Sequence, residues 1–467
     1  MSLRSASEDQ ARAHAGEQDG APGHAMPSAA PAGTGRAGWI WIAVAMATSF
    51  PWLAVRVLLD WHQLPPLAVA ALTGLGILGA AFILSWAAEA FQMDVSQALA
   101  LALLSLIAVL PEYAVDVVFA WKAGLNPEDP TLASYAVANM TGSNRLLIGV
   151  GWSSVVLLAW WRARRRSRGR PVGSPDDPTE TSGGAVTLER GQALEIGALA
   201  LATLYSFIIP LKGGLSLVDT VVLVSLFGVY AWGTSRVPAE HPELVGPALV
   251  IGALPPARRR TVTYGLFLFA AAVIFVSAEP FAEGLVETGT AFGIDEFLLV
   301  QWLAPFASES PEFLVALLFA WRGMAGAGLR TLVASKVNQW TLLIGTLAVA
   351  YSLARGGMYA LPLDGRQVEE LLLTSAQSLF ALVLIANFDL SVKEALVLLG
   401  TFLVQLVFPD PQVRIWMAGA YMLMSVLILA RSPARRAMIM QIPAMIRESI
   451  GSPQKDAVAT SSPARGS

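Results

Sequence analysis

The sequence predicts an all-α integral membrane protein with about twelve transmembrane helices, arranged as two five-helix repeats of inverted topology with one extra helix at each end. Three observations lead to this fold class. Of the 467 residues, 55% are hydrophobic and only 14% are charged, whereas soluble domains contain about a quarter charged residues. The apolar residues fall into blocks long enough to cross a bilayer, and one sequence motif occurs twice.

The N-terminal segment carries no helical pattern. Residues 1–36 are rich in Ala, Gly, Pro and Ser without apolar periodicity, which predicts a disordered cytoplasmic tail. The apolar block that follows, residues 37–60, is too long for the core of a signal peptide. We therefore expect an extra transmembrane helix ahead of the first repeat.

Eleven further apolar blocks each have about the length that a membrane span requires. In chain order they cover residues 67–91, 98–121, 132–161, 193–211, 215–232, 262–285, 297–321, 329–353, 368–388, 391–408 and 413–430. The first five form the predicted first repeat, residues 67–235, which includes a cytoplasmic loop at 162–190. The next five form the second repeat, residues 262–408. The last, residues 413–430, is an extra helix before a cytoplasmic tail at 431–467.

Arginine residues gather in every second loop. They lie at 162–170, at 258–260, at Arg322 and Arg330, and at 435–436, whereas the loops between them hold one or two cations at most. Cationic loops remain on the cytoplasmic side of a membrane. Both termini are therefore predicted to be cytoplasmic, in a multi-pass protein of the cell membrane (inner or plasma).

One motif is repeated at an interval of 200 residues. A Pro-Glu-aromatic sequence begins at Pro111 and again at Pro311, and each copy runs on into Phe-Ala-Trp at the same spacing. Each copy precedes a helix with a Leu-Leu-Ile-Gly run, at 146–149 and 342–345. The loop charges give the two copies opposite orientations. Inverted repeats of this kind are typical of secondary transporters, whose substrate site lies near the bilayer midplane.

A proline inside a helix removes one backbone donor and frees a carbonyl, which must find another partner in lipid. The glutamates that follow the two prolines, Glu112 and Glu312, add carboxylate oxygens. Hard cations take oxygen ligands of both kinds, and intramembrane carboxylates are usually functional. We predict that these two glutamates bind a cation together. The alternative is a structural role in which each caps a broken helix.

At these positions the sequence resembles the calcium/cation antiporter superfamily, which includes the sodium/calcium exchangers, as a divergent member. Each repeat of the family carries Thr-Ser-x-Pro-Glu on one helix and Gly-Asn-x-x-Gly-Ser-Asn on the next. The first repeat here matches at Pro111, Glu112, Asn139, Gly142, Ser143 and Asn144. The second matches at Ser308, Pro311, Glu312 and Asn338, in a looser form.

The resemblance implies a secondary-active cation antiporter that binds its ion at the paired glutamates and works by alternating access, with outer gating helices sliding past a fixed core. The implied oxygen ligands beside the glutamates are Ser308, Ser143, Asn144 and Asn338, although polar side chains also join helices in membranes. The resemblance implies no cofactor. The transported ions are Ca²⁺, Na⁺ and/or H⁺, and the exchanged pair is open between Na⁺/Ca²⁺, Ca²⁺/H⁺ and Na⁺/H⁺.

The departures from the family pattern concern charge. Glu309 stands where the family has Ser, and Asp116 lies one turn beyond Glu112 on the same helical face. Arg145 and Lys336 place cations next to the asparagine motifs. Our hypothesis is that these bases fill some places that sodium ions occupy in the sodium/calcium exchangers, while the acids join in ion binding. Alternatively, the two additional acids only neutralise the two bases, and Lys336 extends toward the cytoplasmic face.

The first repeat lacks the two hydroxyl side chains that precede the Pro-Glu pair in the family motif. Ala108 and Val109 replace the Thr-Ser pair and offer no side-chain oxygen. A buried carboxyl group can exchange a metal ion for a proton, because burial favours its neutral form and a bound cation favours its ionised form. Proton coupling is therefore an alternative to sodium coupling.

Other function classes lack residues that they need. The chain has no cysteine, and its four histidines lie in predicted tails or loops, so an intramembrane enzyme has no thiol or imidazole to use. No zinc-protease motif and no phosphate-binding Gly-rich loop occurs. A cation channel is disfavoured because several buried acids suit tight binding better than rapid throughput. The expected partners are inorganic cations and the lipid bilayer, without nucleic acid or a protein partner.

Overall fold

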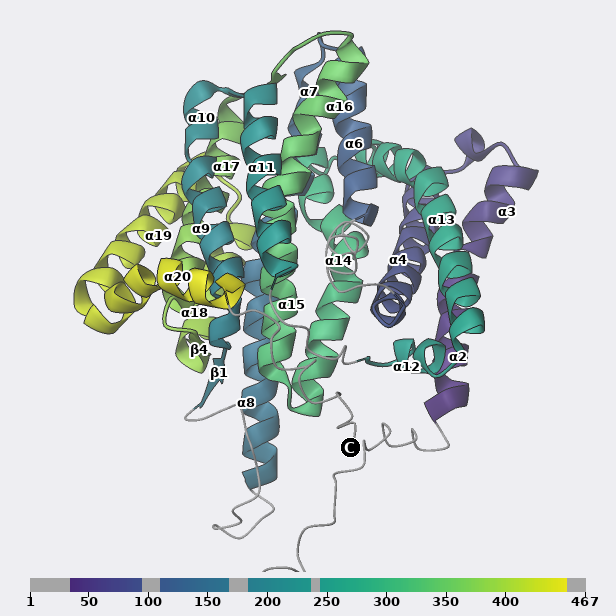
Figure 1. Cartoon of the computed structure of the whole chain (residues 1–467). Helices are drawn as coiled ribbons and strands as arrows, with labels where there is room; N and C mark the ends of the chain where they lie inside the picture. The colour runs from purple at the N-terminus through teal and green to yellow at the C-terminus, as the bar shows by residue number, and fades with distance from the viewer. Residues whose placement is uncertain (1–33, 95–109, 168–183, 237–243, 452–467) are drawn as a thin grey trace, which may run out of the picture.

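The computed structural model describes residues 34–94, 110–167, 184–236 and 244–451. Within these ranges the protein is almost entirely helical (Figure 1). Ten helical segments of the described residues are long and apolar enough to cross a membrane. The predicted class, an all-α multi-pass membrane protein, is confirmed.

The ten segments coincide with ten of the predicted spans, and several comprise two consecutive helices. They are formed by α2 with α3, α4, α7 with α8, α9 with α10, α11, α13, α14, α15 with α16, α17 and α19. The helices are α2 (Thr34–Ala47), α3 (Phe50–Leu58), α4 (Pro66–Phe91), α6 (Leu110–Leu125), α7 (Pro130–Leu146), α8 (Ser153–Ser167), α9 (Ala193–Ser206), α10 (Ile208–Lys212), α11 (Leu217–Thr234), α12 (Ala248–Gly252), α13 (Pro256–Phe292), α14 (Glu296–Arg322), α15 (Ala325–Asn338), α16 (Ile344–Arg355), α17 (Gly365–Ile385), α18 (Val392–Val407), α19 (Pro411–Arg431) and α20 (Pro433–Gly451).

Two predicted spans are not among the ten. The helix α18 has 16 residues, which is short for a membrane span. The helix α6 is described from Leu110, and the first part of its predicted span, residues 98–109, lies outside the described residues. The same is true of most of the predicted cytoplasmic loop and of residues 1–33 of the predicted N-terminal tail.

The predicted C-terminal tail contains a helix that the sequence analysis did not anticipate. Residues 433–451 form α20, which packs across α9. Its Ile442 and Ile446 lie against Gly197 of α9, where the missing side chain makes room for them. The apolar side of α20 is thus covered by the helix bundle.

The helices α4 and α13, here called the α4–α13 pair, make the most extensive helix contact within the described residues. They run antiparallel: Gly284 of α13 lies against Ala70 near the start of α4, whereas Tyr264 of α13 contacts Phe91 at the end of α4. With α2 and α12 the pair encloses a smaller apolar core, while Ala70 and Ile77 of α4 and Phe281 and Leu285 of α13 pack into the main core. Figure 1 shows α2, α4 and α13 on one side of the view and α9, α17 and α19 on the other.

Two short antiparallel strand pairs tie the first half of the chain to the second. The strand β1 (Ala185–Thr187) pairs with β4 (Asp389–Ser391), and β2 (Gly214–Leu215) pairs with β3 (Leu361–Pro362). In the first half β1 precedes α9 and β2 precedes α11, and in the second half β3 precedes α17 and β4 precedes α18. Exchanging the two halves therefore converts one strand pair into the other.

Each half also contains one π-helical segment at a corresponding place. The segment η2 (Leu147–Trp152) follows α7, and η5 (Gln339–Leu343) follows α15. Each overlaps its copy of the Leu-Leu-Ile-Gly run. A π-turn locally widens a helix and frequently occurs at functional sites. Both segments directly continue the helices that carry the asparagine motifs.

Candidate functional site

Four helices carry the predicted site residues, α6 and α7 from the first half and α14 and α15 from the second. The closest approach is between α7 and α14 at Gly142, where an added Cβ atom would lie 1.8 Å from the carbonyl oxygen of Gln301. Pro305 lacks the amide that would otherwise bond this carbonyl within α14. Glycine at 142 therefore lets α7 pack directly on a carbonyl that proline has released.

The helix α14 continues through both of its prolines, Pro305 and Pro311. Ser308 lies between them and is buried. Its hydroxyl donates to the carbonyl oxygens of Ala304 at 3.2 Å and Pro305 at 3.3 Å. The predicted ligand Ser308 is thus bonded to its own helix, as hydroxyl groups in membrane helices commonly are.

Three carboxylates lie close enough to repel one another. Glu112 on α6 interacts electrostatically with Glu309 and Glu312 on α14, and their exposed fractions are only 2%, 2% and 9%. Both carboxylate oxygens of Glu112, and one oxygen each of Glu309 and Glu312, are buried without a hydrogen-bond partner in the described part of the chain. The other oxygen of Glu309 accepts from Gln339 at 2.8 Å. Buried polar groups in this state are rare in proteins.

Asp116 extends this acidic cluster by one turn of α6. It is fully buried. One of its oxygens accepts from Asn139 Nδ2 at 2.8 Å, the other has no partner in the described ranges, and its charge interacts with that of Glu112. Across those ranges it forms no ion pair with Arg145 or Lys336, so its contacts do not support a neutralising role.

Lys336 has no exposed surface and lies next to the acidic cluster. Its Nζ donates to Oδ1 of Asn144 at 2.7 Å and to the carbonyl oxygen of the same residue at 3.4 Å. The ammonium group also lies 4.3 Å from the centre of the Trp340 ring and interacts electrostatically with Glu309 and Glu112. The alternative in which Lys336 extends to the cytoplasmic face is therefore wrong.

The neutral candidate ligands differ in how many of their polar atoms already form hydrogen bonds. Asn144 accepts from Lys336 and donates through Nδ2 to the carbonyl of Met140 at 2.8 Å, so both ends of its amide are engaged. Asn338 accepts through Oδ1 from the Tyr113 hydroxyl at 3.2 Å. Ser143 lies beside the carboxylates, and its buried hydroxyl has no well-formed hydrogen bond with any described residue. Ser143 is the most available neutral oxygen.

Arg145 has a carboxylate partner of its own. Its Nη2 lies 2.6 Å from Oε2 of Glu370 on α17, and its Nη1 donates to Gln405 of α18 at 3.3 Å. The guanidinium carbon lies 4.9 Å from the centre of the Trp302 ring. The charge of Arg145 is thus balanced by Glu370, so of the two predicted modulating bases only Lys336 contacts the candidate ligands directly.

Sequence reasoning missed the acidic residues on α17. Glu370 also lies 3.6 Å from Arg414 of α19, which pairs with Glu369 at 2.9 Å. A signal was present, because both glutamates fall inside the predicted span 368–388 and Arg145 requires a partner within the membrane. The sequence alone did not show which helix carries that partner.

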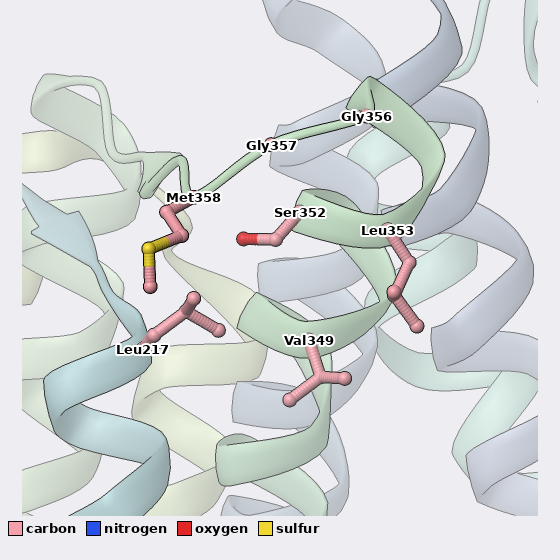
Figure 2. A pocket seen from close by; sticks show the side chains of 7 residues that line it. All are labelled: Leu217, Val349, Ser352, Leu353, Gly356, Gly357 and Met358. Carbon is pink, nitrogen blue, oxygen red and sulfur yellow. The ribbon is translucent and has the colours of Figure 1, made fainter.

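An apolar hollow between α11 and the end of α16 is not part of this site (Figure 2). It is lined by Leu217, Val349, Ser352, Leu353, Gly356, Gly357 and Met358. The Ser352 hydroxyl donates to the carbonyl of Tyr359 and accepts from the amide of the same residue, so the one oxygen-bearing side chain in the lining of this hollow is already engaged. Within the residues described, no group of three His, Cys, Asp or Glu side chains is arranged to hold a metal ion. Backbone carbonyls, hydroxyls or water would have to complete the coordination of a cation at the acidic cluster.

Comparison with known proteins assigns the fold. Residues 65–235 and 262–409 match the family described as sodium/calcium exchanger protein. Among solved structures, the chain is similar to the H⁺/Ca²⁺ exchanger CAX, with 42% identity, coverage of 89% of this chain and 98% of that chain, and a TM-score of 0.80. It shares its fold with native YfkE, with 14% identity, coverage of 83% and 99%, and a TM-score of 0.53. No match is found among curated protein sequences.

The two matched segments cover well over half of the chain, and their limits fall within a few residues of the predicted repeats, 67–235 and 262–408. The resemblance predicted from the Pro-Glu and asparagine motifs is thereby confirmed. The protein belongs to the sodium/calcium exchanger protein family, and it is a membrane cation antiporter rather than an enzyme.

Proposed function

We propose that this antiporter exchanges Ca²⁺ for H⁺ at a site formed by Glu112, Glu309 and Glu312. The observation that carries the proposal is the set of buried carboxylate oxygens without a hydrogen-bond partner in the described ranges. An ionised carboxylate in an apolar medium is strongly unfavourable unless it is paired. Either a bound cation or a proton neutralises the charge of the buried carboxylates. The cation and the proton would therefore bind to the same site alternately.

The charge of the acidic cluster suits a divalent ion. Glu112, Asp116, Glu309 and Glu312 provide four carboxyl groups, and Lys336 provides one ammonium group. The formal charge is −3 when all are ionised, so one Ca²⁺ neutralises most of it. Carboxylate, hydroxyl and carbonyl oxygens are the ligands that Ca²⁺ takes.

Lys336 favours the proton over sodium as the counter-ion. It already supplies one positive charge to Glu112 and Glu309, and it occupies Oδ1 of Asn144. The hydroxyl of Ser308 is bonded to its own helix. Two of the neutral ligands that the resemblance implies are therefore already engaged, and the carboxylate oxygens that have no partner can take up protons. The similarity to the H⁺/Ca²⁺ exchanger CAX at 42% identity agrees with proton coupling, and sodium/calcium exchange is the second candidate.

We further propose that the two halves are inverted repeats and that both termini are cytoplasmic, in the cell membrane. The repeat rests on the Pro-Glu motifs 200 residues apart, on the matched π-segments η2 and η5, and on strand pairs that interchange when the halves are exchanged. The orientation rests on the arginine-rich loops. The proposed partners are inorganic cations and lipid.

The test is ⁴⁵Ca²⁺ uptake into proteoliposomes that contain the purified protein. We expect an acid-inside pH gradient to drive uptake and a sodium gradient at uniform pH not to drive it. Glu312→Gln should lower uptake by at least about tenfold, because the amide cannot alternate between a proton and a metal ion and loss of a ligand weakens binding on this scale. The matched control is Glu287→Gln, an exposed glutamate of α13, which should transport normally.

Other results would contradict the proposal. Uptake driven by a sodium gradient at uniform pH would establish sodium/calcium exchange instead. Calcium flux that needs no counter-ion on the opposite side would indicate a channel. Undiminished uptake by Glu312→Gln would remove the acidic cluster from the transport site.

A further inference from the structure

An ion pair joins the helix α6 to the α4–α13 pair. The Nζ atom of Lys122 lies 2.5 Å from Oε1 of Glu283 and 3.2 Å from Oε1 of Glu279. Lys122 belongs to the last turn of α6, whose Glu112 is in the acidic cluster. The side chains of Lys122 and Glu283 are 22% and 37% exposed, so this contact lies outside the buried site. It connects α6 to a pair of helices that lies between the main core and the smaller core formed with α2 and α12.

The second half of the chain contains the counterpart of this contact. Arg322 follows Lys122 by 200 residues, the interval that separates Glu312 from Glu112. Arg322 is the last residue of α14, and Lys122 lies in the last turn of α6. The cation whose charge acts on the carboxylate of Glu89, on α4, is Arg322. Each Pro-Glu helix thus ends in a base near a glutamate of the α4–α13 pair.

The two contacts lie at opposite ends of the pair. Because α4 and α13 are antiparallel, Glu283 lies at the level of Ala70, beside which its neighbour Gly284 packs. Glu89 follows Ala70 by 19 residues along α4. At a rise of about 1.5 Å per residue this separates the two contacts by about 28 Å, which is close to the thickness of the hydrocarbon core.

The two contacts are in different states. At one end, Lys122 is engaged by Glu279 and Glu283 of α13. At the other end, Oε2 of Glu89 accepts from the backbone amide of Val245 at 3.1 Å, and Oε1 is buried without a hydrogen-bond partner in the described ranges. Arg322 is exposed at the end of its helix. One ion pair is closed while its counterpart is open.

We propose that Lys122–Glu283 and Arg322–Glu89 are alternating latches, each of which holds the α4–α13 pair in one of two positions against α6 and α14. A shift of the pair along its axis that releases Glu283 from Lys122 carries Glu89 to Arg322, because both glutamates move with one rigid unit. Partly exposed ion pairs contribute little net free energy, so neither latch traps the carrier. The inference rests on the proposed function, since it assumes that the pair moves during exchange.

The absence of cysteine from the chain gives a direct test. The double variant Lys122→Cys/Glu283→Cys is reconstituted and treated with a reversible bifunctional methanethiosulfonate. We expect cross-linking to lower ⁴⁵Ca²⁺ uptake by more than tenfold, with recovery on reduction. Cross-linking Glu89→Cys/Arg322→Cys should have the same effect. The locked proteins should still bind ⁴⁵Ca²⁺, each from one side of the vesicle only, and that side should differ between the two.

The matched control is Lys212→Cys/Asp219→Cys. These residues form a similar ion pair, but both lie outside the α4–α13 pair, on α10 and α11, so cross-linking them should leave uptake unchanged. Transport that survives either lock, or two locks that leave the same side open, would overturn the latch proposal while the wild type still exchanges calcium. Failure of the wild type to exchange calcium would instead refute the proposed function.

Discussion

Among the individual residues, the two buried bases differ in their partners. Arg145 contacts Glu370, Gln405 and the ring of Trp302. It therefore links α7 to α17, α18 and α14. Lys336 is held by Asn144 and by the charges of the acidic cluster. Replacing Arg145 should therefore change the stability of the protein, whereas replacing Lys336 should change which ions it transports.

The first prediction concerns the pair Arg145 and Glu370. Arg145→Ala should lower the free energy of unfolding by about 3–5 kcal/mol, because it leaves Glu370 buried without its main partner. Arg414, 3.6 Å from Glu370, offsets part of the loss, so we expect the lower end of this range. The double variant Arg145→Met/Glu370→Leu should cost less than the single change. Unfolding of the purified protein in detergent measures both, and strictly additive losses would contradict the prediction.

The second prediction concerns Lys336. Lys336→Gln removes the fixed positive charge from the acidic cluster and frees Oδ1 of Asn144. We expect sodium to compete with calcium uptake more strongly in this variant, with the sodium concentration for half-inhibition lowered by about tenfold, which corresponds to roughly 1.4 kcal/mol. The control is Lys393→Gln, an exposed lysine of α18. Equal sodium sensitivity in both variants and the wild type would show that Lys336 does not set ion choice.

The third prediction concerns Gly142. In Gly142→Ala the new methyl group meets the carbonyl oxygen of Gln301, so α7 and α14 must separate. Overpacking of this kind costs about 1–3 kcal/mol, and we expect uptake to fall with stability. The control is Gly228→Ala on α11, which has open space around it and should gain up to about 1 kcal/mol from better helix propensity. A stable, active Gly142→Ala variant would contradict the close approach.

The sequence predicted part of the buried acidic cluster. Glu112 and Glu312 were predictable because a Pro-Glu pair inside an apolar span is a local signal that occurs twice. The partners of Arg145 and Lys336 were not, because they depend on which helices adjoin α7 and on how each helix is rotated about its axis. Neither property is encoded in local spacing, so the pairing of Arg145 with Glu370 required the structure.

At the scale of elements, an ion pair connects the residues just after α4 to the first turns of α13. Arg259 donates through Nε and Nη2 to both carboxylate oxygens of Asp94, at 2.7 and 2.8 Å, and Arg260 lies 3.2 Å away. These hydrogen bonds, led by those from Arg259, lower the pKa of Asp94 below its usual value. The contact joins the two members of the α4–α13 pair to each other, so they can move together.

The fourth prediction follows from the direction of this pKa shift. Because the pKa of Asp94 is lower in the folded state, its stabilising effect is present above the unfolded pKa of about 3.9 and is lost as the pH falls through the folded pKa. Asp94→Asn should therefore melt at a lower temperature than the wild type at pH 7, and this difference should shrink below pH 4. Thermal unfolding in detergent across this pH range is the measurement. A difference that does not change with pH would show that the carboxylate charge is not responsible.

The existence of the membrane-spanning helices was easier to predict than the helices and helical distortions that depend on packing. Ten spans follow from apolar length alone, because lipid requires about twenty apolar residues whatever the fold. The helix α20 was missed because its apolar residues are interrupted by arginines and are covered only when it lies on α9. The π-segments η2 and η5 likewise depend on packing against other helices rather than on local propensity.

At the scale of the whole molecule, the proposed inverted arrangement makes a prediction about sidedness. Glu128, after α6, and Ile294, before α14, should both face the outside, whereas Thr261, near the start of α13, should face the cytoplasm. Single cysteines at these positions are unique thiols, since the chain has none of its own. We expect a membrane-impermeant maleimide to label the first two in intact cells and the third only after lysis. Labelling of Glu128→Cys but not Ile294→Cys would contradict the arrangement.

The two strand pairs also constrain how the chain is made. During synthesis β1 cannot pair until β4 has been made about 200 residues later, and β2 cannot pair until β3 has been made about 145 residues later. At a synthesis rate of about 5–20 residues per second, the N-terminal half spends roughly ten to forty seconds in the bilayer before its partners emerge from the ribosome. During that interval the acids of α6 have no second half to shield them from lipid. We therefore expect biogenesis of this protein to include a holding step, in which the insertion machinery retains the first helices until the last ones arrive.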